Sequence, residues 1–266
     1  MAMISISISL WVASLRGELQ YRANFLIMAL MGIVYQCTGF AFIWVVLARF
    51  QALAGWTLGE VAFLYGLRLI MHALNGALTG GLYSLEWKVR QGEFDRFLVR
   101  PMPPLLQLMC ERIHVSIAGD LIGGLVLFAA AASLVTVNWT PLALLYLALA
   151  LIGGALVELA LRVLFSALSF RFLSANAFMS VLDTVFSNFA NYPLKIFGGV
   201  LEFLLTFGVP LAFMAYFPAV VLLGRTGELQ VNPIFAYAAP LAGIVWLFAA
   251  LRVFHYEMRN YQSAGH

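Results

Sequence analysis

The chain has 266 residues, of which 63% are hydrophobic and only 10% are charged, and its formal net charge is +3. Because soluble globular domains carry about 25% charged residues, this composition excludes a soluble protein with a water-facing surface. Several apolar runs are continuous and reach the roughly 20 residues that cross a bilayer as a helix, whereas a membrane β-barrel shows short alternating segments. The sequence therefore predicts an all-α integral membrane protein that forms a single transmembrane domain over residues 1–266.

The first segment, residues 1–22, alternates isoleucine with serine and then carries Arg16, Glu18 and Arg22. This mixture is too polar for a span, so we expect an amphipathic segment on the membrane surface with Trp11 near the lipid headgroups. The alternative is a disordered tail that precedes the first span.

Five apolar segments are predicted to cross the membrane. The short, uncharged turn at residues 138–141 joins the third segment to the fourth, which indicates a tight helical hairpin. In chain order the five segments are residues 25–48, 58–81, 115–137, 141–165 and 233–254.

Lysine and arginine fall mainly on one side of these segments. If the N-terminus is cytosolic, that side collects the basic residues of 82–114 and most of those near both chain ends, while Arg49 and Arg225 stay outside. Cytoplasmic loops of membrane proteins carry this excess of basic residues. We therefore expect both termini in the cytosol and an even number of crossings.

The region between the fourth and last segments contains two apolar pieces, residues 170–190 and 196–223. With six crossings in total, only one of the two pieces can cross fully. Glycine and proline interrupt the second piece, which favours a re-entrant hairpin at 196–223 and a crossing at 170–190. The alternative is that the first piece lies inside and the second crosses.

Two pairs of ionisable residues lie within predicted spans at a spacing of four, which places each pair on one helix face. Glu158 and Arg162 are expected to form a structural ion pair, and the alternative is that they line a polar pathway. Arg68 and His72 share a face of the second span, which we expect to pack against a partner subunit rather than to contact substrate.

The interval 82–114 is the one long polar stretch of the chain. We predict a helix over 82–91 that breaks at Gly92, followed by a short helix that Pro101 ends. Phe94, Phe97 and Leu98 would share one face of this second helix, which could dock in a groove of a soluble partner. Binding to anionic headgroups through the basic residues is equally compatible with the pattern.

Sequence motifs for nucleotide or metal chemistry are missing. A phosphate-binding loop needs glycines followed by Lys and then Ser or Thr, but the two lysines, Lys88 and Lys195, precede valine and isoleucine. The four histidines are scattered without a metal-ligand spacing. We therefore expect no cofactor bound by this chain and no enzymatic activity of its own.

The segment from Gly92 to Pro101 resembles the cytosolic loop signature of permease subunits of type-2 ABC transporters. The residues that carry the resemblance are Gly92, Phe94, Asp95, Phe97, Leu98, Arg100 and Pro101. Weaker similarities lie at Tyr21-Arg22, in the stretch from Tyr192 to Ala219, and in the terminal residues 261–265, so that the resemblance extends over most of the chain. It is strongest with a bacterial subfamily of about 260 residues.

The resemblance implies a six-helix unit that pairs with a second permease copy or a paralogue and recruits two separate ATPase subunits. ATP and magnesium would bind on those partners, and the direction would be export, here of an amphipathic or lipid-like substrate. Coupling to the ATPases would use Arg90, Gly92, Phe94, Asp95, Phe97, Leu98, Arg100 and Pro101. The alternative function is a secondary transporter or channel that works alone.

Overall fold

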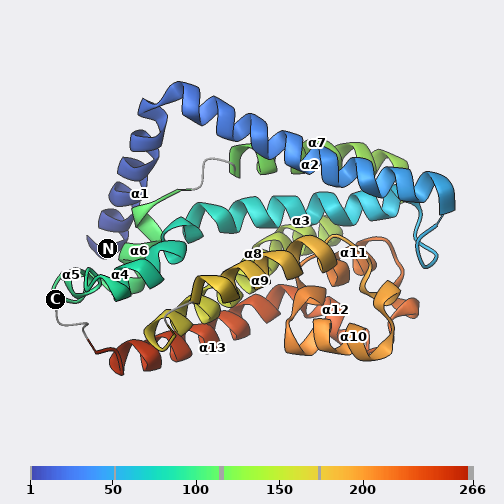
Figure 1. Cartoon of the computed structure of the whole chain (residues 1–266). Coiled ribbons are helices and arrows are strands. Elements are labelled where there is room, and N and C mark those ends of the chain that lie inside the picture. The colour runs from blue at the N-terminus through green and yellow to red at the C-terminus, as the bar shows by residue number, and fades with distance from the viewer. Residues whose placement is uncertain (1, 51, 114–116, 173–174, 263–266) are drawn as a thin grey trace.

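The computed structural model describes residues 2–50, 52–113, 117–172 and 175–262. These residues form helices joined by short connections, as predicted (Figure 1). Residues 114–116, at the end of the predicted cytosolic interval and the start of the third predicted span, lie outside the described residues, as do residues 263–266 of the tail.

Five helical segments of the described chain are long and apolar enough to cross a membrane. They correspond to the five predicted spans, so the expectation of an all-α membrane protein is confirmed. The main helices of these segments are α2 (Arg22–Phe50), α3 (Leu58–Thr79), α7 (Ile117–Leu134), α8 (Pro141–Ala167) and α13 (Ala239–Arg259).

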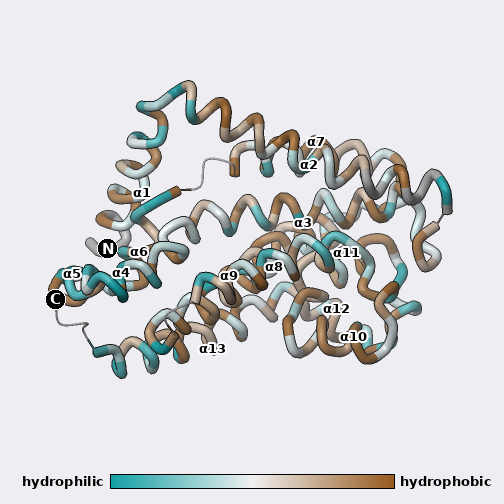
Figure 2. Tube along the Cα trace, viewed as in Figure 1, coloured by the Kyte–Doolittle hydropathy of each residue, from teal (hydrophilic) through white to brown (hydrophobic). Residues whose placement is uncertain are grey.

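Apolar residues predominate along these helices, as Figure 2 shows by their hydrophobic colour, and many of their side chains are exposed. Leu26 on α2, Leu142 on α8 and Val245 on α13 are each more than 60% exposed. Contiguous exposed apolar surface of this kind would be unstable in water, so these faces contact lipid. The central helix α3 is different, because most of its residues are buried among α2, α7 and α8.

The helices α8 and α13 pack most closely at two glycines. A Cβ atom on Gly243 would lie 2.3 Å from the carbonyl oxygen of Gly153, and one on Gly153 would lie 2.5 Å from that of Pro240. No side chain fits at such distances, so glycine at these positions allows the two backbones to come into contact.

The region between α8 and α13 holds one medium helix and several short ones. The helix α9 (Ala175–Phe189) runs back along α8, and its 15 residues extend about 22 Å, less than the roughly 30 Å of a bilayer core. The sixth crossing therefore stays a prediction.

The chain between α9 and α13 is gathered at one end of the bundle, near the α2–α3 connection (Figure 1). Its elements are η3 (Leu194–Phe197), α10 (Gly199–Phe203), η4 (Leu204–Gly208), η5 (Leu211–Phe213), α11 (Tyr216–Leu222), η6 (Thr226–Glu228) and α12 (Ile234–Tyr237). No continuous helix forms over residues 196–223, because glycine and proline interrupt it. A re-entrant hairpin is compatible with this arrangement and stays a prediction.

The opposite end of the bundle carries the polar interval. The helix α3 continues through η1 (Gly80–Ser84) into α4 (Leu85–Arg90), after which the chain turns at Gly92, whose φ of +67° favours glycine. The short helices α5 (Asp95–Leu98) and α6 (Pro104–Glu111) follow. The predicted break at Gly92 and the short helix after it are confirmed.

The N-terminal segment is helical as α1 (Ala2–Gln20) and packs along α6. The indole nitrogen of Trp11 donates a hydrogen bond to the Ala77 carbonyl oxygen at 2.9 Å, and Ser14 Oγ donates to that of Glu111 at 3.2 Å. These contacts attach α1 to the end of the bundle that carries the polar interval. Its placement on a membrane surface stays a prediction.

Candidate functional site

A cavity of about 680 Å³ lies between helices α2, α3, α7 and α9, inside the part of the chain that crosses the membrane. Its lining is unusual for such a location, because several of the side chains are charged or can form hydrogen bonds. Ionisable residues at membrane depth are costly unless they are paired or hydrated, and they mark functional sites by default.

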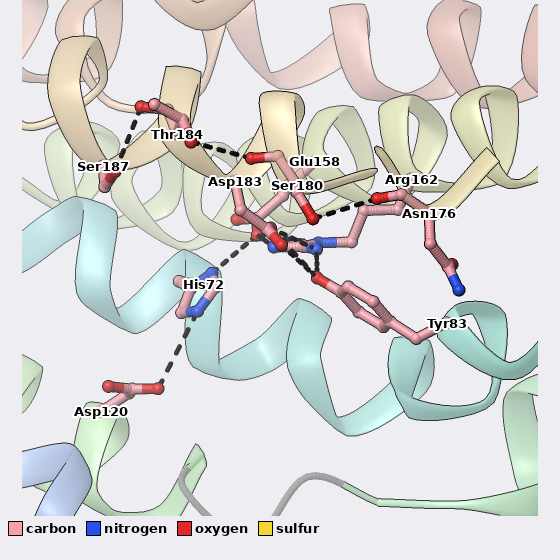
Figure 3. Close-up of polar contacts among 10 residues, drawn as sticks. All are labelled: His72, Tyr83, Asp120, Glu158, Arg162, Asn176, Ser180, Asp183, Thr184 and Ser187. Carbon is pink, nitrogen blue, oxygen red and sulfur yellow. Dashed lines mark hydrogen bonds and ion pairs between the residues drawn. The ribbon is translucent and has the colours of Figure 1, made fainter. Parts of the chain in front are cut away.

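One group of these residues surrounds Arg162 on α8. The Arg162 Nη2 atom lies 3.0 Å from Glu158 Oε1, one helical turn earlier, and its Nη1 atom lies 2.9 Å from Asp183 Oδ1 on α9. The same Nη1 atom donates a hydrogen bond to the hydroxyl of Tyr83, which in turn donates to Asp183 at 3.0 Å (Figure 3). Arg162 thus joins α8 to α9 and to the end of the α3 segment.

A second group begins at His72 on α3. Its Nδ1 atom lies 2.6 Å from Glu158 Oε1, and its Nε2 atom lies 3.9 Å from Asp120 on α7 (Figure 3). The amide of Gln36 on α2 donates to Asp120 at 2.6 Å, and the hydroxyl of Tyr65 donates to Gln36 at 2.7 Å. The two groups meet at Glu158, so the polar network connects five helices.

The two predicted pairs have different outcomes in this network. Glu158 and Arg162 lie within ion-pair distance of each other. For Arg68 and His72, the expected packing of their shared face against a partner subunit stays a prediction, and within this chain His72 contacts Glu158. Arg68 lines the same cavity and is 6% exposed.

Sequence reasoning missed the acidic partners on other helices. The sequence alone could not place Asp120 and Asp183, because contacts between α7, α9 and the rest of the bundle bring both into the network. A signal for Asp183 was present. It belongs to a polar stripe along α9 at helical spacing, formed by Asn176, Ser180, Asp183, Thr184, Ser187 and Asn191.

Part of the polar stripe of α9 is exposed, namely Asn176, Ser180 and Thr184, whereas Asp183 contacts Arg162 on α8. The opposite face buries Ala175, Met179, Leu182 and Phe186. The hydroxyls of Ser180, Thr184 and Ser187 donate to backbone carbonyls of their own helix (Figure 3). These internal bonds lower the cost of the polar face but do not make it suitable for lipid.

The predicted coupling residues of the polar interval form a compact unit at the end of the bundle. Phe94 is fully buried, and its ring centroid lies 5.0 Å from that of Phe170 and 5.3 Å from that of Tyr261. Phe97 is 8% exposed, and Gln107 Nε2 donates to its carbonyl oxygen at 2.8 Å. The unit is therefore fixed to the ends of α8 and α13 by aromatic packing.

Comparison with protein families decides between the possible kinds of membrane protein. Residues 33–265 match the family model described as ABC-2 family transporter protein. The chain belongs to the ABC-2 transporter family. No curated protein and no solved structure gives a significant match. The chain is thus the membrane-spanning permease component of an ABC transporter, a class that works with ABC ATPase partners.

In this ABC-2 permease the predicted coupling residues differ in their exposure. Phe94 and Phe97 contact their own chain, and Gly92 shapes the turn, so these three residues hold the unit together. Leu98 is 46% exposed and the Arg90 side chain 54%, and Val99, at 84%, is exposed although it was outside the predicted set. We call the exposed residues Arg96, Leu98, Val99, Arg100 and Pro101 the tip.

Asp95, another predicted coupling residue, is partly exposed beside the tip. Whether the tip contacts an ATPase stays a prediction. Within the described part of this ABC-2 permease, no group of three or more His, Cys, Asp or Glu residues could hold a metal ion.

Proposed function

We propose that this ABC-2 permease exports an amphipathic substrate across the bacterial inner membrane with ATP hydrolysed by two separate ATPase subunits. In this proposal both termini are cytosolic, the chain crosses six times, and two permeases enclose the transport pathway. ATP and magnesium bind to the partner subunits.

The observation that carries the proposal is a helical connection between the cavity and the polar interval. The segment Leu58–Arg90 is helical throughout, through α3, η1 and α4. It carries Arg68, His72 and Tyr83 of the cavity and ends two residues before Gly92. Displacement of the tip by a closing ATPase would therefore move the cavity lining through one helical segment, as in other rigid-body switches.

The lining of the cavity supports an amphipathic substrate. Its charged and hydroxyl-bearing side chains suit a polar group, while the exposed surfaces of α2 and α7 nearby are apolar and contact lipid. A molecule with a polar head and an apolar tail would match both environments.

The polar stripe of α9 supports a second permease. Asn176, Ser180 and Thr184 are exposed on a helix that we expect to cross the membrane. Such a face must be covered by protein or border a water-filled path. A second copy or a paralogue placed against α9 would cover this face with protein and enclose a water-filled path beside it.

Exchange of an exposed leucine for a charge tests the role of the tip. We expect Leu98→Glu to reduce ATPase stimulation and transport about tenfold, since a single well-packed contact residue is worth over 1 kcal/mol of binding. The measurement uses the complex of the permease with its copurifying ABC ATPase in liposomes, with ATP hydrolysis and export of a fluorescent amphiphile as readouts.

The matched control is Leu134→Glu, because Leu134 is also an exposed leucine at the end of a helix but lies at the opposite end of the bundle. It should leave ATP hydrolysis unchanged. Full activity of Leu98→Glu would contradict coupling through the tip, and ATP-independent transport would favour a secondary transporter.

A further inference from the structure

Arg68 is a buried cation that pairs with no residue of the described chain. It lies on α3, is 6% exposed and lines the cavity. Its Nε atom is fully buried and has no hydrogen-bond acceptor among the residues that the structure describes. No ion pair joins Arg68 to an acid of the described chain, so its charge has no direct counter-charge there.

The acids near the cavity are already used by other residues. Glu158 and Asp183 bind Arg162, and Glu158 also contacts His72. Asp120 accepts a hydrogen bond from Gln36. A buried charge that lacks an opposite charge destabilises a protein, so its presence in the cavity indicates that a ligand supplies the missing charge in the functional state.

The surroundings of Arg68 offer further hydrogen-bond donors. The side chains of Tyr35, Asn188 and Tyr192 line the same cavity. The volume of about 680 Å³ falls within the range of small-molecule sites, which is roughly 300–1,000 Å³. Arginine binds carboxylate and phosphate through two parallel N–H···O bonds, which makes it the preferred residue for planar recognition of an oxyanion.

We propose that Arg68 binds an oxyanion, a carboxylate or a phosphate, in the cavity. Under the proposed function, on which this inference rests, the oxyanion is the head group of the exported amphiphile. A bilayer phospholipid could supply the same chemistry. The network from Tyr65 through Gln36 to Asp120 fixes the helices on both sides of Arg68, so that the guanidinium is held in place before the ligand arrives.

Binding of a defined amphiphile tests the assignment. The full-length permease in nanodiscs of phosphatidylcholine is titrated with dodecyl phosphate and, separately, with dodecyltrimethylammonium. We expect the anionic probe to bind at least about tenfold more tightly than the cationic one, and Arg68→Gln to remove most of this difference. Arg68→Lys keeps the positive charge but lacks the two parallel N–H donors of the guanidinium, so it should bind dodecyl phosphate with intermediate affinity.

Two further arms distinguish the source of the oxyanion. If phosphatidylglycerol in the disc competes with dodecyl phosphate, a lipid headgroup occupies the site. If it does not compete, the oxyanion belongs to the transported amphiphile. The matched control is Arg171→Gln, because the Arg171 side chain is 57% exposed and pairs with Glu257 away from the cavity. It should leave the affinity unchanged.

Loss of Arg68 should not lower the melting temperature of the ligand-free protein, since the substitution would break no hydrogen bond to any residue that the structure describes. Unchanged affinity of Arg68→Gln for dodecyl phosphate would overturn the assignment. So would separation of paired permeases by the same substitution, because Arg68 would then pair with a carboxylate of the partner subunit. Neither result affects the Leu98→Glu experiment, which reports coupling without regard to substrate charge.

Discussion

Glu158 is the residue on which the polar network of the membrane region depends. Its side chain is fully buried, and Arg162 and His72 both contact its Oε1 atom. The spacing of four residues in the sequence was sufficient to predict the proximity of Glu158 and Arg162. It could not show His72, Asp120 or Asp183 beside them, because these contacts join residues 21 to 86 positions apart and depend on how the helices pack.

Removal of the Glu158 charge should destabilise the protein strongly. Glu158→Gln leaves Arg162 and His72 in a buried site without their shared carboxylate, and breaking a buried pair in this way costs about 3–5 kcal/mol. The free energy of unfolding in mixed micelles is the quantity to measure.

The matched control is Glu228→Gln. Glu228 also contacts two cations, Arg225 and Lys195, but its side chain is 31% exposed, so the loss should be about 1 kcal/mol or less. Equal losses for the two variants would show that burial of Glu158 does not strengthen its interactions.

At the scale of helices, the sequence predicted the long spans but left two alternatives open for the region between α8 and α13. Continuous hydrophobicity alone determines the long spans, because a bilayer requires about 20 apolar residues in a helix. Residues 190–238 form short helical pieces whose ends depend on contacts with the rest of the bundle. The polar stripe of α9 was visible in the sequence and was overlooked because its residues are interspersed with apolar ones.

The contact between α8 and α13 yields a prediction at this scale. Gly243→Ala places a methyl group 2.3 Å from the Gly153 carbonyl oxygen, so the two helices must separate. We expect a loss of about 1–3 kcal/mol in the free energy of unfolding, as is typical of overpacked contacts.

Gly123→Ala is the control for this substitution, since Gly123 also lies within a membrane helix but its added Cβ would come no closer than 3.9 Å to any atom. This variant should be as stable as the unsubstituted protein or slightly more stable. Equal stability of the two variants would mean that α8 and α13 are farther apart than described.

The bundle has two distinct ends, one formed by the polar interval and the other by the short helices between α9 and α13, and α3 joins them. Figure 1 shows α1, α4, α5 and α6 together at one end with the C-terminal part of α13, and α10, α11 and α12 at the other. The sequence predicted that residues 92–101 would be a distinct unit and identified the family. It could not show that Phe94 and Phe97 are buried, because the aromatic partners Phe170 and Tyr261 come from distant parts of the chain.

In the proposed mechanism, ATP bound by a partner changes the cavity through the tip and α3. Double electron–electron resonance tests this claim with spin labels on both sides of the cavity, at Tyr35→Cys on α2 and Asn188→Cys on α9, both exposed. The natural cysteines Cys37 and Cys110 are first replaced by serine.

The distance between the labels is measured in the complex with its ABC ATPase, at rest and with nucleotide trapped by vanadate. We predict a shift of about 5 Å, on the order of one helical turn, and its loss in Leu98→Glu. If a complex that hydrolyses ATP shows the same distance distribution at rest and in the trapped state, ATP does not change the cavity and the proposed coupling is wrong.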